Sequence, residues 1–385
     1  MPFEKPVCSG LIERIGHENS FIKHKAFIDG KEHVVEKTLE LAGHEAGLQE
    51  VLSLLTDPDI GVLKDPKEIY AVGHRVVHGG EAFAATTFIS EEIKAKIKTL
   101  FPLAPLHNPA NYMGINVAEK IFSNAKQIAV FDTSFHQTMP EKAYRYAIPK
   151  SYYTDLRIRA YGFHGTSHKY VSEQAISYLE KPDAKLITIH LGNGCSMAAV
   201  KSGKSVDTTM GFGPLSGLVM GTRSGDIDPS IIFHLIDQLG YDPEQVNTLL
   251  NKRSGMFGMT GYSDMRDIEH AINNGNEDAE LASEVYAYRI QKYIGAYAAS
   301  LNGLDAIVFT AGVGENDISM RQRICENLDF LGIIPDLDKN SVRSGELRDI
   351  SAESSKVRIL VIPTNEELEI ARQCVELLET GKQSV

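Results

Sequence analysis

The chain has 385 residues, 43% of them hydrophobic, and a formal net charge of −12. This length exceeds one ordinary hydrophobic core, so we expect two domains, and the acidic balance argues against nucleic acid as a general partner. No apolar stretch is long enough to cross a membrane, and four widely spaced cysteines without a C-x-x-C pair indicate free thiols in a reducing cytoplasm.

The first part of the chain predicts a strand at residues 20–28, a hairpin turn at Gly30-Lys31 and a helix at residues 44–55. An apolar strand at residues 69–72 then leads into His74 and Arg75. If this segment is extended, alternation places Arg75 and Val77 on one face. A guanidinium beside an isopropyl group suits a small ligand with an anionic end and an apolar end. The alternative is an edge strand with a solvated arginine.

The middle of the chain carries isolated polar residues after regular elements. Ser90 opens a helix, and a proline-bounded loop carries His107, which such loops more often use structurally. The strand at 128–131 ends in Asp132, for which a helix cap and a catalytic carboxylate are equally favoured.

In the segment YGFHGTSH, His164 is expected in a glycine-flanked loop, with Thr166 or Ser167 as the N-cap of a helix through Ile176. The pair His164 and His168 has a metal-like spacing. Because no third ligand accompanies the pair, zinc is disfavoured.

The stretch LITIHLGNGCS, residues 186–196, predicts a buried strand followed by a turn at Gly192-Asn193-Gly194. The two glycines are expected to allow positive φ and to bring bare N–H groups close to phosphate oxygens. A tight turn without a ligand is the commoner explanation of G-N-G alone. However, DAIVFTAGVGEN, residues 305–316, repeats the design. Four strands with polar residues at their carboxyl ends predict an α/β protein with one cleft.

The C-terminal part begins with a glycine-rich segment, residues 205–228, which implies close backbone approach and carries the single arginine Arg223. Asp228 is expected to cap the next helix, and a long helix is predicted at residues 279–301. Asp264 would cap a shorter helix or line a nucleotide site. After a strand at 357–362, Glu366 either offsets a helix macrodipole or anchors Mg²⁺.

Eight motifs occur in one order along nearly the whole chain, from about residue 10 to residue 380: GHRVVHGG, LAPLHNP, VFDTSFHQTMP, YGFHGTSHKYV, HLGNG, MGFGPLSGLVMGTRSGDIDP, FTAGVGEN and PTNEELEIAR. Together they resemble the acetokinase family. The resemblance implies the sugar kinase/actin-like (ribonuclease H-like) fold, with two similar α/β domains and a nucleotide cleft between them. The N-terminal domain would comprise residues 1–134 and 368–385, and the nucleotide-binding and dimerisation domain residues 135–367.

The resemblance also implies a reaction: reversible, direct in-line phosphoryl transfer from ATP to acetate, giving acetyl phosphate and ADP, in a cytoplasmic homodimer. Mg²⁺ is the implied cofactor, with Mn²⁺ as an alternative. The residue types agree with this chemistry, because acetate is already an anion and needs no strong base. The difficulty is to bring two anions together and to stabilise charge on the transferring phosphoryl group.

Roles are implied for the residues that match the family motifs. Arg75 would hold the substrate carboxylate or the phosphoryl group, Asp132 would be the active-site carboxylate, and Glu366 would serve Mg²⁺. His164 and Arg223 would stabilise charge on the equatorial oxygens. The acid's methyl group would be enclosed by Val77, Leu106, Phe163 and Pro214, with His107 nearby. ATP would be held by His190, Leu191, Gly192, Asn193, Gly194, Asp264, Met265, Arg266, Gly312, Val313, Gly314, Glu315 and Asn316.

Val77 decides the expected acid. Propionate-using relatives tend to be smaller at this position, so valine favours acetate. One methylene is worth only about 1–3 kcal/mol in a pocket, so propionate should be a poorer substrate rather than an excluded one. A propionate-preferring kinase is the alternative.

The sequence departs from the family at its start, where relatives carry a strand and a loop of the form N-A-G-S-S-S-L-K that this chain lacks. A start codon assigned too far downstream is the preferred explanation, with an active natural protein that begins upstream. The rival is a non-catalytic nucleotide-binding or regulatory relative that has lost this loop. A dinucleotide-dependent dehydrogenase is much weaker, because Met197 stands where G-x-G-x-x-G needs its last glycine.

Overall fold

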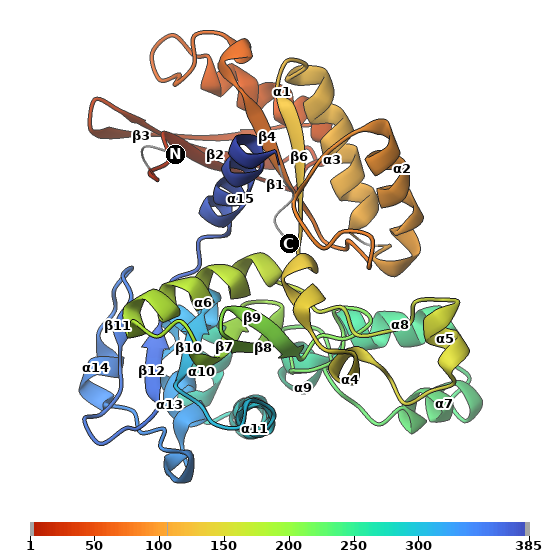
Figure 1. The fold of residues 1–385 in the computed structure, drawn as a ribbon, viewed down its shortest axis with the longest axis vertical. Helices are drawn as coiled ribbons and strands as arrows, with labels where there is room; N and C mark the ends of the chain where they lie inside the picture. The colour runs from red at the N-terminus through yellow and green to blue at the C-terminus, as the bar shows by residue number, and fades with distance from the viewer. Residues whose placement is uncertain (1–3, 106, 382–385) are drawn as a thin grey trace. The chain divides into compact units, whose positions relative to one another are not determined.

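The computed structural model describes residues 4–105 and 107–381, which form two compact units (Figure 1). The first unit comprises residues 1–131 and 370–385, and the second comprises residues 132–369. The chain therefore crosses between the units directly after one strand and once more within its last helix. The sequence predicted these crossings at 134/135 and at 367/368.

The first unit contains two three-stranded sheets. One has the order β1-β2-β3 and is antiparallel, and the other has the order β4-β6-β5, with β4 and β6 parallel. The strands are β1 Cys8–Glu13, β2 Ser20–Ile28, β3 Lys31–Leu39, β4 Ala71–Val76, β5 Thr87–Phe88 and β6 Lys126–Phe131. The helices are α1 His44–Leu55, α2 Glu91–Thr99, α3 Asn108–Ile121 and the later part of α15 Glu366–Thr380. The predictions for residues 20–28, 44–55 and the Ser90 cap are confirmed.

Strand β4 begins and ends later than the sequence predicted. It spans Ala71–Val76 instead of residues 69–72, so His74 and Arg75 lie within the strand rather than after it. The reason is Val76, which is fully buried in a core cluster with Phe131 of β6 and keeps the chain extended. Arg75 is exposed and Val76 is buried, as alternation predicts, but the strand ends before Val77, so the strand itself does not place Val77 on the face of Arg75.

The second unit is built on a six-stranded sheet with the order β11-β12-β10-β7-β8-β9. Its strands are β7 Lys185–Leu191, β8 Cys195–Lys201, β9 Lys204–Thr208, β10 Ala306–Thr310, β11 Arg348–Asp349 and β12 Arg358–Val361. Strands β7, β10 and β12 are parallel, and Thr310 at the end of β10 lies opposite His190 near the end of β7. The carboxyl ends of the two glycine-bearing strands are therefore neighbours, as expected.

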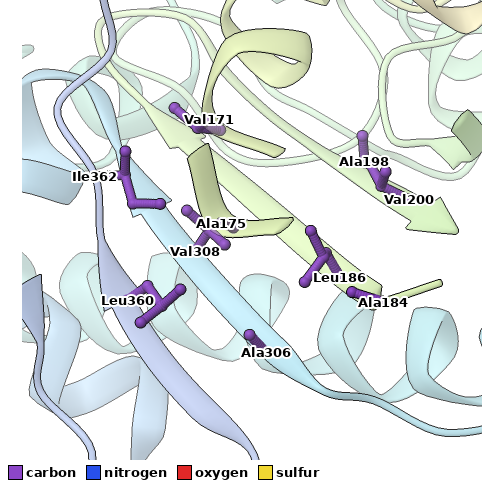
Figure 2. Packing of buried hydrophobic residues seen from close by; sticks show 10 residues of the cluster. All are labelled: Val171, Ala175, Ala184, Leu186, Ala198, Val200, Ala306, Val308, Leu360 and Ile362. Carbon is purple, nitrogen blue, oxygen red and sulfur yellow. The ribbon is translucent and has the colours of Figure 1, made fainter. Parts of the chain in front are cut away.

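Helix α6, Gly165–Leu179, packs on this sheet through Val171 and Ala175. Figure 2 shows both side chains over Val308, Leu360 and Ile362. All five are almost completely buried, so this apolar layer anchors the N-terminus of α6 beside the strand ends. The remaining helices of the second unit are α4 Glu141–Tyr144, α5 Lys150–Thr154, α7 Ser230–Asp237, α8 Pro243–Lys252, α9 Gly255–Thr260, α10 Met265–Asn273, α11 Glu277–Leu301, α12 Ala311–Asn316, α13 Ile318–Cys325 and α14 Leu337–Ser341.

Two helix starts differ from the sequence prediction. The N-cap of α6 is His164, in the left-handed conformation at φ 55°, and not Thr166 or Ser167. Both of those residues are buried in the first turn, where the Ser167 hydroxyl bonds to His190 instead of capping the helix. Helix α7 begins at Ser230, and the Asp228 carboxylate accepts a hydrogen bond from the Ser230 N–H at 2.8 Å.

The glycines at residues 312–314 do not form the predicted turn. They lie in the short helix α12, which follows β10 directly. The entry into this helix is made by Ala311 at φ 65° and not by a glycine. Among the described helices, none is both long and apolar enough to cross a membrane.

Candidate active site

The turn between β7 and β8 is the centre of the site. Gly192 donates its N–H to the Gly194 carbonyl at 3.1 Å. Neither glycine has a positive φ, so the predicted left-handed conformation was wrong, whereas the predicted approach of their N–H groups to a phosphate stays a prediction. Gly194 is required by proximity: a Cβ there would lie 2.7 Å from Arg223 Nη2 and 3.5 Å from His164 Nε2. The turn therefore brings the arginine and the histidine together.

A hydrogen bond to the backbone holds Arg223 in this position. Its Nη1 donates to the Pro214 carbonyl at 2.6 Å, across the glycine-rich segment that carries both residues. Burial lowers the pKa of Arg223 from its usual value, although a guanidinium stays charged at any physiological pH. A fixed, half-buried guanidinium stabilises negative charge better than a mobile one in water.

His164 is fixed by two contacts. Its Nδ1 lies 2.9 Å from Ser196 Oγ, and its ring stacks on His190 with 4.2 Å between centroids and 20° between planes. His190 is held in turn through its Nδ1, which lies 2.8 Å from Ser167 Oγ. With the ring held by these contacts, its Nε2 edge faces Gly194.

The two predicted carboxylates also lie near the first turn of α6. Asp132 is buried, and its carbonyl accepts from the Gly165 N–H at 2.9 Å, next to His164. Asp132 is not the cap of the following 3-10 turn, because Thr133 holds that position. Glu366 is half-buried at the start of α15, two residues after Thr364, whose hydroxyl donates to Ser167 at 2.9 Å.

A cavity of about 660 Å³ opens beside the glycine turn, entirely within the second unit. This volume is typical of a cofactor or nucleotide site. Eight residues predicted to bind the nucleotide line it: Gly192, Asn193, Asp264, Met265, Arg266, Gly312, Val313 and Asn316. Sequence reasoning thus located most of this cavity.

Asp264 performs both of the roles left open by the sequence. Its carboxylate accepts from the Arg266 N–H at 2.9 Å, which caps α10, and its side chain also lines the cavity. The Arg266 guanidinium donates to the same carboxylate at 2.6 Å. These hydrogen bonds lower the pKa of Asp264 to about 2.

Five other predicted nucleotide residues do not line this cavity: His190, Leu191, Gly194, Gly314 and Glu315. Glu315 faces the backbone, where its Oε1 accepts from the N–H groups of Ala311 at 2.8 Å and of Thr364 at 3.0 Å. Its carboxylate therefore braces the strained entry of α12. Leu191 is fully buried, and Gly194 faces Arg223 and His164.

Seven lining residues were missed by the sequence reasoning: Gly221, Met256, Ser263, Glu269, Tyr286, Asp317 and Arg343. Gly221 had a usable signal, because it lies in the glycine-rich segment, and a Cβ there would lie 2.2 Å from Asn193 Oδ1. Ser263 and Glu269 flank the predicted Asp264 site. Arg343 is brought to the cavity by tertiary folding alone, and no local pattern marks it.

Three of the other predicted substrate residues, Arg75, Val77 and His107, belong to the first unit. Arg75 is exposed on β4, Val77 follows that strand and donates its N–H to Asn111 Oδ1 at 3.1 Å, and His107 is the exposed N-cap of α3. Leu106 lies outside the described residues. Phe163 is buried in the second unit, beside His164. A methyl pocket that joins residues of both units stays a prediction.

No cluster of three or more metal-ligating side chains occurs within residues 4–105 and 107–381. Mg²⁺ is usually held by one or two carboxylates together with water and substrate phosphates, rather than by a cage of protein ligands. A single half-buried carboxylate such as that of Glu366 fits this donor set.

Comparison with known proteins identifies the family. Residues 2–372 match the Acetokinase family. The acetate kinase of Flavobacterium johnsoniae is 59% identical over 379 residues, 98% of this chain and 95% of the relative. The crystal structure of Porphyromonas gingivalis acetate kinase matches with a TM-score of 0.89 and 45% identity, over 97% of this chain and 93% of that one.

A propionate kinase structure from Francisella tularensis is similar to the same degree, with a TM-score of 0.89 and 44% identity over 95% of this chain and 92% of that one. The agreement extends over sequence and structure, and it confirms the α/β fold class inferred from the motifs. The chain belongs to the acetokinase family.

Proposed function

We propose that the chain catalyses reversible phosphoryl transfer between ATP and acetate, giving ADP and acetyl phosphate. The observation that carries the proposal is the approach of Arg223 Nη2 and His164 Nε2 to Gly194, in the turn whose other residues line the 660 Å³ cavity. Gly192 and Asn193 of the turn thus line a nucleotide-sized space, whereas Gly194 faces two groups able to stabilise anionic oxygens.

The proposed reaction combines these positions with the role that the family motif implies for Arg75. ATP occupies the cavity, with its phosphates directed along Gly192 and Asn193 toward Gly194. Arg223 and His164 stabilise the charge that spreads over the equatorial oxygens of the transferring phosphoryl group. The acetate carboxylate attacks in line, and Arg75 of the first unit supplies the charge that holds this second anion.

Magnesium fits the proposal as a companion of the nucleotide. Glu366, with Asp132 near the same helix turn, would hold Mg²⁺, or alternatively Mn²⁺, which would neutralise phosphate charge when bound. Asp132 is buried, its carbonyl bonds to the N–H of the residue after His164, and its carboxylate would orient groups at the phosphoryl end of the site.

Acetate is the proposed acid because Val77 would limit the space around its methyl group. One added methylene changes binding by about 1–3 kcal/mol, so kcat/KM for propionate should be roughly 10- to 200-fold lower than for acetate. The similarity to a propionate kinase makes this ratio the measurement that separates the two acids.

The test is an assay of acetyl phosphate formation with arginine variants. We expect Arg223→Ala and Arg75→Ala to lower kcat about a hundredfold or more, without a change in the circular dichroism spectrum. Arg358→Ala is the matched control, because Arg358 is half-exposed on β12 and contacts Asp349 at 3.6 Å. Near-normal turnover in the Arg75 or Arg223 variant would refute the assignment. ATP binding without acetyl phosphate would instead identify a non-catalytic relative.

We also propose a homodimer in the cytoplasm. Helix α7 buries none of its residues, and its Ile231 and Phe233 side chains are 44% and 65% exposed. Apolar side chains gathered on one exposed helix are typical of a surface that another subunit covers. The four cysteines are free thiols, which fits a reducing compartment. Light scattering of the purified chain measures the proposed mass of two copies.

A further inference from the structure

Behind His164 lies a chain of hydrogen bonds that ends at a backbone carbonyl. Ser196 Oγ lies 2.9 Å from His164 Nδ1 and 2.7 Å from His168 Nε2. His168 Nδ1 lies 2.7 Å from Thr188 Oγ1, and the Thr188 hydroxyl reaches the Ala198 carbonyl at 3.5 Å. His168, Thr188 and Ser196 are completely buried, so water cannot replace these partners.

The contact with the carbonyl, at 3.5 Å, favours one direction for the bonds in this chain. A carbonyl only accepts, so the Thr188 hydroxyl proton points to Ala198, and Thr188 Oγ1 accepts from His168 Nδ1–H. Burial lowers the pKa of His168 well below its usual value, so the ring is neutral and its Nε2 carries no proton. Ser196 must then donate its only proton to His168 Nε2.

With its proton committed to His168, Ser196 can only accept from His164. The His164 ring therefore carries its proton on Nδ1. Its Nε2, 3.5 Å from the position of a Cβ on Gly194, points to the place where Arg223 Nη2 also arrives. From this side, the ring donates to a phosphoryl oxygen only when it is also protonated on Nε2, and Ser196 stabilises this doubly protonated form by accepting from Nδ1–H.

We propose that Ser196 is a positioning residue for phosphoryl transfer: its hydroxyl, oriented by His168 and Thr188, fixes the rotation and the tautomer of His164. The inference deepens the proposed function and rests on the role that it gives to His164. Ser196 does not face the substrates, so it acts only through the histidine.

The second unit provides a matched control for a serine–histidine bond. Ser205 is also completely buried, and its Oγ lies 2.8 Å from His136 Nδ1. The His136 ring donates from Nε2 to the Phe163 carbonyl at 3.0 Å, so this pair ends at the backbone and not at the His164 ring. Removal of the Ser196 hydroxyl costs two buried hydrogen bonds and removal of the Ser205 hydroxyl costs one, but only Ser196 contacts His164.

The first test compares Ser196→Ala with Ser205→Ala in thermal unfolding and in steady-state kinetics. We expect both variants to lose Tm, Ser196→Ala more than Ser205→Ala, because Ser196 makes two of these hydrogen bonds and Ser205 makes one. Turnover should fall about tenfold or more in Ser196→Ala, with KM values for ATP and acetate within about twofold, and should stay within twofold of wild type in Ser205→Ala. A loss of kcat that is equal in the two variants, or absent in Ser196→Ala, would overturn the positioning role.

The second test reads the tautomer directly and does not depend on activity. In the protein labelled with ¹⁵N-histidine, at a pH where the His164 ring is neutral, we expect Nδ1 to be protonated and Nε2 bare; His164→Asn assigns the signals. Ser196→Ala should shift the ring toward the Nε2–H form. An Nε2–H ring in the wild type would refute the bond directions. Normal turnover in His164→Ala would instead refute the role of His164 in the proposed function.

Discussion

The two glycine motifs of the second unit have similar sequences but different structures. Residues 192–194 form a turn between antiparallel strands β7 and β8, whereas residues 312–314 lie in helix α12. The following residues decide the difference. Cys195–Val200 is a completely buried run that pairs with β7, and Asp317 caps helix α13 after the second motif. A glycine pair after a strand therefore indicates closeness to a ligand site rather than one backbone conformation.

The two motifs also need their glycines for different reasons. A Cβ on Gly194 would lie 2.7 Å from Arg223 Nη2, whereas a Cβ on Gly312 would meet nothing within 4 Å. Neither residue has a positive φ. Gly194 is thus required because a side chain there would meet Arg223 and His164, whereas nothing in the protein around Gly312 requires a glycine.

The largest expected effect comes from the pair Gly194→Ala and Gly312→Ala. The first should lower kcat about a hundredfold, because the new methyl group displaces the Arg223 guanidinium, while Tm changes little since a side-chain end can move. The second should keep turnover within about threefold and raise stability by about 0.5–1 kcal/mol, because alanine favours the helix. Kinetics and thermal unfolding measure both. Equal activity in the two variants would remove the distinction between the motifs.

Glu315 provides the next test, because it belongs to the second motif but bonds to the backbone. Glu315→Ala leaves the N–H groups of Ala311 and Thr364 without their acceptor, and should lower the free energy of unfolding by about 2–3 kcal/mol. Glu315→Gln keeps one acceptor oxygen and should lose less. Urea unfolding measures the loss. A large rise in KM for ATP at unchanged stability would show that the carboxylate contacts the nucleotide instead.

The smallest effect is the acid sensitivity of the histidines behind the first motif. Burial lowers the pKa of His136 from 6.5 to about 4. Between these values the unfolded chain binds a proton that the folded chain excludes, so stability is complete above pH 6.5 and falls as the pH falls toward 4. The loss approaches roughly 1 kcal/mol per pH unit for one histidine.

Urea unfolding between pH 7 and pH 5 measures this dependence. In His136→Asn, the free energy of unfolding should decline less steeply with falling pH than in wild type, by the equivalent of about one bound proton. This difference in slope does not depend on the stability of the variant at pH 7. His270→Asn is the control, because His270 lies in the last turn of α10 outside this cluster. Identical slopes in wild type and His136→Asn would contradict the assignment of a neutral buried ring.

Much of the fold could be predicted from local patterns. The strand at 20–28 and the helix at 44–55 have the predicted bounds, because period-two and period-3.6 patterns are strong there. The predicted bounds and caps are wrong where contacts between distant segments determine the local structure. Burial of Val76 extends β4, and the Ser167 hydroxyl is taken by His190, which leaves His164 as the cap of α6.

The site was predicted unevenly for a similar reason. Local patterns marked Asn193 in a glycine turn after a strand, Arg223 in a glycine-rich segment and Asp264 at the start of a helix. Arg343 and the direction of the bonds through Ser196 depend on segments that meet only in the folded protein. Glu315 shows the opposite error, since a motif residue can serve the backbone that presents the motif.

Part of the proposed acid recognition lies in a different unit from the cavity. Arg75 and Val77, which would select the acid, belong to residues 1–131, whereas the nucleotide cavity is formed wholly within residues 132–369. A substitution at Val77 could therefore change the preferred acid without altering any residue that lines the cavity.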